Sequence, residues 1–381
     1  MRITTLRTLV AAAALAATSL VQADVTIGVS LPLTGPASGL GIPVGNGIKM
    51  WPTSIAGQNL KVVVYDDATD PTKGVQNANR FVVEDKADLV IGSAATPVAV
   101  AMAGPLAEAQ TMQIMVSPGP LPPGKDAWSF RIAQANGIMA HPMVEHMKAQ
   151  GIKTLGFLGY SDAYGESWLK DLTAELEKNG GGIKIIATER FARADTAVTA
   201  QALKLVAANP DAILVVASGS GAAMPHKGVV ERGYKGKIYQ THAAASRDLM
   251  RIGGKDVEGA FVVSGPAVVA EQLPASHPSK ALALDYVQKY EKIYGPGSRN
   301  QFAAHGYDLG LLLEKIIPIA LKTAKPGTPE FRAALRDALE GLKNVVGTHG
   351  VYNMTPANHN GLDERARVLV QVSNGEWRLL K

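Results

Sequence analysis

The stretch TLGFLGYSDAYGESWLKDLTAELEKNGGGIKIIATERFARADTAVTAQALKLVAANPDAILVV, residues 154–216, alternates two kinds of pattern. Three short apolar runs, rich in β-branched residues, predict strands: Thr154–Leu158, Ile183–Ala187 and Ala212–Val216. Two amphipathic segments between them predict helices: Gly165–Asn179 and Thr196–Ala208. Strands that alternate with helices form parallel sheets covered on both faces. The stretch therefore predicts an α/β domain.

The same alternation extends over most of the chain. Further strands are predicted at Val25–Leu31, Lys61–Tyr65, Asp88–Ile91, Gln113–Val116, Ile238–Tyr239 and Gly259–Val263. Asp70-Pro71 predicts the start of a helix over Pro71–Glu84, because Asp is a capping residue and proline suits the first turn. About nine strands are too many for one doubly wound domain. We therefore expect two successive sets, near residues 24–137 and 138–266.

The pattern changes after Pro266. Helices are predicted at Ser279–Tyr294, Tyr307–Thr323 and Pro329–Leu342, and short strands at Gly350–Tyr352, Arg367–Val372 and Trp377–Leu380. These elements are too few for a third domain, so the chain is expected to cross between two lobes more than once. The predicted architecture is two doubly wound parallel-sheet lobes. The N-terminal lobe takes residues 24–137 and 267–346, and the C-terminal lobe takes 138–266 and 347–381.

Met1–Ala23 has the layout of a secretory signal peptide. Arg2 and Arg7 precede an apolar run over Leu9–Leu20, and small residues lie at the expected cleavage positions. The run is shorter than the roughly 20 residues that a membrane-spanning helix needs, which argues against an N-terminal anchor. The chain has no cysteine. Without cysteine, a lipid-anchored form, disulfides and thiolate catalysis are excluded by chemistry. The signal peptide predicts an exported protein.

Composition and motifs argue against several function classes. The net charge of +5, which includes two arginines of the leader, is too small to indicate a nucleic-acid or membrane-surface partner. The eight histidines are scattered without zinc-ligand spacing, so no metal or cofactor is expected. The run Ser218-Gly219-Ser220-Gly221 lacks the spacing of a nucleophile elbow. We expect no enzyme, although an exported enzyme on an α/β scaffold stays open as an alternative.

Two further features of the first lobe, a glycine-rich segment and a pair of aspartates, are predicted to have no catalytic or nucleotide-binding role. Gly35, Gly39, Gly41, Gly45 and Gly47 crowd the segment after the first strand, yet they match neither the dinucleotide fingerprint nor the phosphate loop. A flexible mouth to a ligand cleft is expected there. Asp66-Asp67 ends a strand, and these residues are expected to be solvated turn residues.

Five short motifs follow one another in the first half of the chain. They are Leu33-Thr34-Gly35-Pro36, Tyr65-Asp66-Asp67 with Asp70-Pro71, Val90-Ile91-Gly92, Ser117-Pro118 and Ser161-Asp162-Ala163-Tyr164-Gly165. In this order they resemble the branched-chain amino-acid-binding proteins of ABC importers. The resemblance implies a type I periplasmic binding protein, with two lobes on a three-stranded hinge that close on a small ligand. It also implies a monomer in the periplasm, which serves a permease in the inner membrane.

The resemblance implies ten site residues. Thr96 matches a hydroxyl residue that contacts the ligand carboxylate, and Ser117, Gly119 and Leu121 lie on the loop that supplies further contacts. Tyr164 matches a second-lobe tyrosine that closes over the ligand. The other matched positions are Leu40 at the mouth, Pro97 beside Thr96, Ser220, His242 and Phe302. Thr96-Pro97-Val98 is similar to the branch of the family that takes benzoate-like acids.

Departures from the family pattern indicate the ligand. His242, in Gln240-Thr241-His242-Ala243-Ala244, stands where amino-acid binders have an acid that pairs with the ligand ammonium. Leu121 replaces a threonine, and Leu40 lies where tyrosine is frequent. A buried ammonium left unpaired would cost several kcal/mol. We therefore expect a small organic acid, aromatic by preference. A branched-chain or other neutral amino acid, and a sensory role in place of transport, stay as alternatives.

Overall fold

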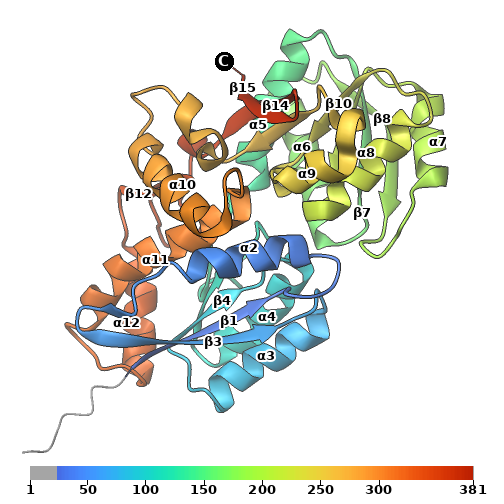
Figure 1. The fold of residues 1–381 in the computed structure, drawn as a ribbon. Coiled ribbons are helices and arrows are strands. Elements are labelled where there is room, and N and C mark those ends of the chain that lie inside the picture. The colour runs from blue at the N-terminus through green and yellow to red at the C-terminus, as the bar shows by residue number, and fades with distance from the viewer. Residues whose placement is uncertain (1–23, 381) are drawn as a thin grey trace, which may run out of the picture.

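The computed structural model describes residues 24–380, so the predicted signal peptide lies outside the described residues. Two separate sheets form the cores of two lobes (Figure 1). Both sheets are built mainly of parallel strands with helices packed around them, as the alternation of patterns predicts. The predicted α/β fold class is confirmed.

The first sheet has the strand order β2-β3-β1-β4-β5-β6. Its strands are β1 (Val25–Leu31), β2 (Ser54–Ile55), β3 (Gln58–Asp66), β4 (Leu89–Gly92), β5 (Met112–Met115) and β6 (Ser129–Arg131). Only the β2–β3 pair is antiparallel. Its helices are α2 (Ser38–Ile48), α3 (Pro71–Val83) and α4 (Thr96–Glu108). As predicted, α3 begins after a capping Asp70, whose side chain accepts from the Thr72 N–H at 2.8 Å.

The second sheet has the order β15-β14-β11-β10-β9-β7-β8. Its strands are β7 (Thr154–Tyr160), β8 (Lys184–Phe191), β9 (Ala212–Val216), β10 (Lys237–Gln240), β11 (Phe261–Ser264), β14 (Val368–Ser373) and β15 (Glu376–Leu379). Strands β14 and β15 are antiparallel additions at the edge. The helices of this part are α5 (Asn136–Ala149), α6 (Ala163–Lys178), α7 (Thr199–Ala208), α8 (Ala223–Val230) and α9 (Arg247–Gly253). Residues 154–216 thus form β7-α6-β8-α7-β9.

The remaining helices and strands lie between β11 and β14 in the sequence. They are α10 (Lys280–Tyr294), α11 (Gln301–Ala320), α12 (Pro329–Glu340) and the hairpin of β12 (Val345–Gly347) with β13 (Gly350–Tyr352). Helix α11 packs against α2 of the first lobe. Short 3-10 turns complete the chain: η1 (Gly219–Ala222), η2 (His242–Ala244), η3 (Gly254–Val257), η4 (Pro266–Gln272) and η5 (Glu364–Ala366).

The chain passes between the two sheets three times. The first crossing lies between β6 and α5, the second between β11 and α11 and begins at Gly265, and the third lies between β13 and β14. Chain crossings between two packed lobes are positions at which hinge bending can occur. The lobe boundaries predicted at residues 137, 266 and 346 stay a prediction.

The expected flexible mouth after β1 is wrong, because the glycine-rich segment forms helix α2. A Cβ on Gly41 would lie 2.2 Å from the Pro32 carbonyl oxygen, and a Cβ on Gly47 would lie 2.2 Å from the Ala303 carbonyl oxygen on α11. The glycines therefore serve close backbone packing rather than mobility. The helix carries Leu40 in a fixed position, 5% exposed.

The expectation of solvated turn residues after β3 is wrong for Asp67. This side chain is fully buried, and it accepts from the Ser30 hydroxyl at 3.3 Å and from the Thr69 N–H at 3.0 Å. Burial raises its pKa to about 6. Asp66 accepts from the Leu33 N–H at 2.8 Å. The two carboxyls therefore fasten the loop that leads into α2.

No helix within residues 24–380 combines the length and the apolar character that a membrane crossing requires.

Candidate ligand-binding site

A cavity lies between the two sheets, where the carboxyl ends of their parallel strands face each other. Thr96 follows β4, Ser117 follows β5, Tyr164 follows β7 and His242 follows β10. In open α/β sheets, ligands bind at the carboxyl ends of the strands, since the loops there are free of the sheet's own packing. The two lobes therefore bring together side chains that are far apart in the sequence.

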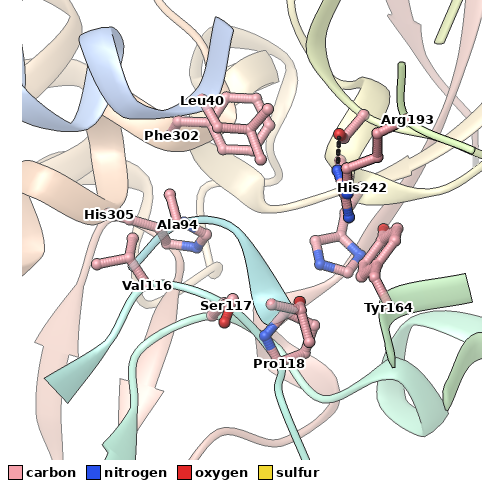
Figure 2. A pocket seen from close by; sticks show the side chains of 14 residues that line it. Leu40, Ala94, Val116, Ser117, Pro118, Tyr164, Arg193, His242, Phe302 and His305 are labelled. Carbon is pink, nitrogen blue, oxygen red and sulfur yellow. Dashed lines mark hydrogen bonds between the residues drawn. The ribbon is translucent and has the colours of Figure 1, made fainter. Parts of the chain in front are cut away.

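The cavity is narrow, with a volume of about 20 Å³, about enough for one water molecule. Fourteen side chains line it: Leu40, Ala94, Thr96, Val116, Ser117, Pro118, Ala133, Tyr164, Arg193, Ser218, His242, Ala243, Phe302 and His305. Figure 2 shows an apolar end, where Leu40 and Phe302 lie together, and a polar side with Arg193, His242 and Tyr164. A lining that is apolar at one end and polar at the other is typical of sites for a small molecule with an apolar body and a few polar groups.

The first-lobe wall offers neutral hydrogen-bond donors. Thr96 opens the first turn of α4, and Pro97 follows it, as suits the first turn of a helix. Ser117 is 2% exposed, and within residues 24–380 its hydroxyl has no hydrogen-bond partner. A buried hydroxyl without a partner is unfavourable, so this group is available for a ligand oxygen.

Tyr164 and His242 form part of the second-lobe wall. Tyr164 is placed by the start of α6, where Asp162 caps the helix and accepts from the Tyr164 N–H at 2.9 Å. Its hydroxyl is hydrogen-bonded to Thr241 Oγ1 at 2.8 Å, and burial raises its pKa. The His242 ring lies 5.8 Å from that of Trp168, and its Nδ1 has no partner within the described residues. Burial lowers the pKa of His242 to about 3, so the imidazole is neutral at pH 7.

Arg193 brings a positive charge to the same wall. Its Nε donates to Asp162 Oδ2 at 2.5 Å, and its Nη1 donates to the Ser218 hydroxyl at 2.9 Å. The guanidinium lies 4.2 Å from the centre of the Tyr160 ring. The side chain is only 11% exposed. These contacts hold the guanidinium in one orientation at the edge of the cavity.

The negative counterpart of this arginine, Asp162, lies outside the cavity lining. None of the fourteen lining side chains, all within residues 24–380, is acidic. Nearby Asp162 has both oxygens engaged, since Oδ1 caps α6 and Oδ2 accepts from Arg193. In the part of the chain that the structure describes, no cluster of three or more acidic or histidine side chains is arranged to hold a metal ion. Within residues 24–380, the lining thus offers no free carboxylate to a cationic ligand group.

Six of the ten predicted site residues line the cavity: Leu40, Thr96, Ser117, Tyr164, His242 and Phe302. Four do not. Pro97 lies beside Thr96 in α4, and Gly119 accepts from Arg131 Nε at 2.7 Å through its carbonyl. Leu121 packs against Met115 and two alanines of α4, and Ser220 lies in η1 against the start of α2. The binding role of all ten stays a prediction.

Sequence reasoning missed Arg193 and His305. Arg193 follows β8 by two residues, as the other site residues follow their strands, but the strand was expected to end at Ala187. His305 lies three residues after Phe302 on α11, hence on the same helix face. The helix was expected to begin only at Tyr307, so this pairing was not visible. Both signals depend on correct element boundaries.

Comparison with known proteins identifies the family. A family model described as periplasmic binding protein matches residues 24–376. The chain belongs to the periplasmic binding protein family. The resemblance read from the five sequence motifs is thereby confirmed.

Relatives of this periplasmic binding protein include solved structures and curated proteins. An extracellular ligand-binding receptor from Rhodopseudomonas palustris HaA2 is 47% identical, with a TM-score of 0.91, over 94% of this chain and 100% of that chain. Leu/Ile/Val-binding protein homolog 3 of Brucella melitensis is 26% identical over 259 residues, 65% of this chain and 69% of that protein. An ABC-transporter solute-binding protein from R. palustris, solved with benzoate, is 19% identical with a TM-score of 0.75, over 94% and 96% of the two chains. This last likeness shows the fold alone.

Proposed function

We propose that this periplasmic binding protein captures a small carboxylate with an apolar, preferably aromatic, body and presents it to an ABC permease. The observation that carries the proposal is the charge in the cavity. Arg193 provides a buried positive group, and no acidic side chain lines the cavity within residues 24–380. A carboxylate gains charge-assisted hydrogen bonds there, whereas a cationic group finds no partner.

His242 supports the exclusion of an ammonium group. A neutral imidazole cannot neutralise a positive charge, and burial keeps His242 neutral at the pH of the periplasm. Asp162 is a poor substitute, since both of its oxygens already accept hydrogen bonds. An α-ammonium buried in this cavity would therefore remain unpaired, at several kcal/mol.

The apolar end supports an aromatic or branched body for the ligand. Leu40 and Phe302 are 5% and 4% exposed, and Val116 and several alanines continue the same wall. Micromolar affinity corresponds to about −8 kcal/mol. A few charge-assisted hydrogen bonds and the burial of one ring can supply that free energy after the entropic terms of binding.

Binding is expected to proceed by closure of the lobes, without turnover of the ligand. Thr96 and Ser117 belong to the first sheet's side of the cavity, and Tyr164, Arg193 and His242 belong to the second. A ligand that contacts both sides stabilises the closed arrangement over the open one, and the permease recognises that arrangement. The curated relative from B. melitensis is named as a binding-protein homolog, which supports a role without catalysis.

A neutral or branched-chain amino acid is the second candidate. It is favoured by the names of curated relatives such as the B. melitensis Leu/Ile/Val-binding protein homolog. The cavity's charge argues against it, as described for the ammonium group.

The proposal is tested by a thermal-shift panel on residues 24–381, with hits confirmed by calorimetry. The panel contains benzoate, hydroxybenzoates, benzoylformate and phenylpyruvate against leucine, isoleucine, valine and phenylalanine. A ligand at 100 times its Kd stabilises the fold by about 2.7 kcal/mol, a shift of a few degrees for a chain of this size. Shifts with the acids alone are expected. Shifts with the amino acids alone would refute the proposed ligand class.

A further inference from the structure

Two buried glutamines join the three crossings between the lobes. Gln134, in the first crossing, donates from Nε2 to the Ala366 carbonyl in the third crossing at 3.1 Å. Gln301, at the start of α11, accepts through Oε1 from the Gly265 N–H in the second crossing at 2.8 Å. Gln301 Nε2 then donates to Gln134 Oε1 at 2.8 Å. Both glutamines are fully buried, so this link is shielded from water.

His305 connects this link to the ligand cavity. It lies one turn after Gln301 on α11, it lines the cavity, and its Nε2 is 3.2 Å from Gln134 Oε1. The backbone groups at the two ends of the link determine which atom of each glutamine amide donates and which accepts. The Gly265 N–H can only donate and the Ala366 carbonyl can only accept, so Gln134 presents its oxygen to His305. The same His305 Nε2 lies 3.4 Å from Gln301 Nε2, so the ring contacts both glutamines of the link.

The second ring nitrogen of His305 takes no part in this link. Its Nδ1 is buried and has no hydrogen-bond partner among the described residues. Burial keeps the pKa of this imidazole well below its usual value, so the ring stays neutral. His349 packs edge-on against the ring at 4.6 Å and donates to the Gln301 carbonyl at 2.8 Å. The ring is thus fixed by protein on one side and faces the cavity on the other.

We propose that His305 couples an occupied cavity to the hinge. A ligand, or a water molecule held by the ligand, contacts the His305 ring at Nδ1 and so keeps Nε2 oriented toward Gln134. Gln134 then holds the first and third crossings together, and Gln301 adds the second. A ligand favours the closed lobes over the open lobes only if it binds the closed lobes more tightly. The contact of the ligand with His305, passed on to the hinge by this link, supplies part of that difference in binding free energy. The inference rests on the proposed capture between the lobes, but not on the ligand's charge.

A double-mutant cycle in ligand affinity tests the coupling, with benzoate and leucine as probes. Gln134 does not line the cavity, so a weaker Kd in Gln134→Leu reports coupling rather than lost contact. Gln134→Leu and His305→Leu are each expected to weaken binding about tenfold, the scale of one hydrogen bond of about 1.4 kcal/mol. Since both act through one link, the double variant is expected to be no weaker than either single variant. Independent effects that multiply to about 100-fold, or an unchanged Kd in Gln134→Leu, would overturn the proposal.

A conservative variant separates this positioning role from a general structural role. His305→Gln keeps an amide donor that can reach Gln134. The side chain in His305→Asn is shorter and cannot reach it. Should His305→Leu fail to fold, His305→Asn is used in its place. Closure is measured by energy transfer between labels on Lys73→Cys in α3 and Lys170→Cys in α6, both exposed. The chain has no native cysteine, so labelling is specific.

With saturating probe, the parent protein and His305→Gln are expected to close fully, while His305→Leu and Gln134→Leu retain an open population. Full closure of all variants would overturn the coupling. Should leucine bind and benzoate not, the proposed ligand class fails, and the same cycle with leucine still tests the coupling.

Discussion

Replacement of Arg193 by methionine removes the positive charge at the cavity and keeps an unbranched apolar side chain. The guanidinium is 11% exposed and is held by Asp162 and Ser218. A hydrogen bond to a charged group contributes about 1.5–3 kcal/mol. At 1.4 kcal/mol per factor of ten, Arg193→Met is expected to weaken benzoate binding about 10- to 100-fold.

Calorimetry with benzoate and benzamide measures this effect, because the two probes share a shape and differ in charge. In the variant, the affinity for benzoate should fall relative to the affinity for benzamide. Asp162 is 22% exposed and can rehydrate when its partner is removed. The variant should nevertheless lose about 1–3 kcal/mol of unfolding free energy, because the hydrogen bonds of the guanidinium are lost, as urea unfolding can verify. An unchanged benzoate Kd, or an equal loss for benzamide, would refute the role of the charge.

Three further changes probe the site and its support. His242→Glu places an acid in the cavity and is expected to weaken benzoate at least tenfold while phenylalanine binding appears; calorimetry on both ligands decides, and unchanged selectivity would contradict the role of His242. Burial lowers the folded-state pKa of His242 to about 3, below the roughly 6.5 of an unfolded chain, so its contribution to stability is complete above pH 6.5 and is lost as the pH falls toward 3. Urea unfolding should therefore show that His242→Gln loses about 2 kcal/mol less than the parent between pH 7.5 and pH 5, whereas equal losses would contradict the burial argument. Gly47→Ala places a Cβ 2.2 Å from the Ala303 carbonyl and should cost about 1–3 kcal/mol, while Gly104→Ala, which meets nothing within 4 Å, should be neutral or stabilising; equal effects on thermal unfolding would contradict close packing of α2 on α11.

Local patterns in the sequence were sufficient for most of the sheet. Runs such as Val25–Leu31 and Ala212–Val216 are buried along their whole length, so an apolar run alone marks them. The cap at Asp70 and the helix end at Asn209, which adopts a left-handed conformation, were predictable because their chemistry is local.

Features that depend on distant partners were not predictable in the same way. The glycines of α2 were predicted to form a flexible mouth to the ligand cleft, because nothing in the sequence shows that Gly47 packs against α11. Asp67 read as solvated, because its partner Ser30 is 37 residues away. Arg193 and His305 escaped notice because each lies beyond an expected element boundary that was several residues short.

The central claim, a cavity that pairs a carboxylate and excludes an α-ammonium, is tested most directly by one matched comparison. Phenylpyruvate and phenylalanine share a carboxylate and an aromatic ring and differ in the keto or ammonium group between them. Calorimetry on residues 24–381 should give phenylpyruvate a Kd at least 100-fold below that of phenylalanine, from an unpaired ammonium of roughly 3 kcal/mol or more. A lower Kd for phenylalanine would contradict the claim and show that an acid outside the lining residues pairs with the ligand.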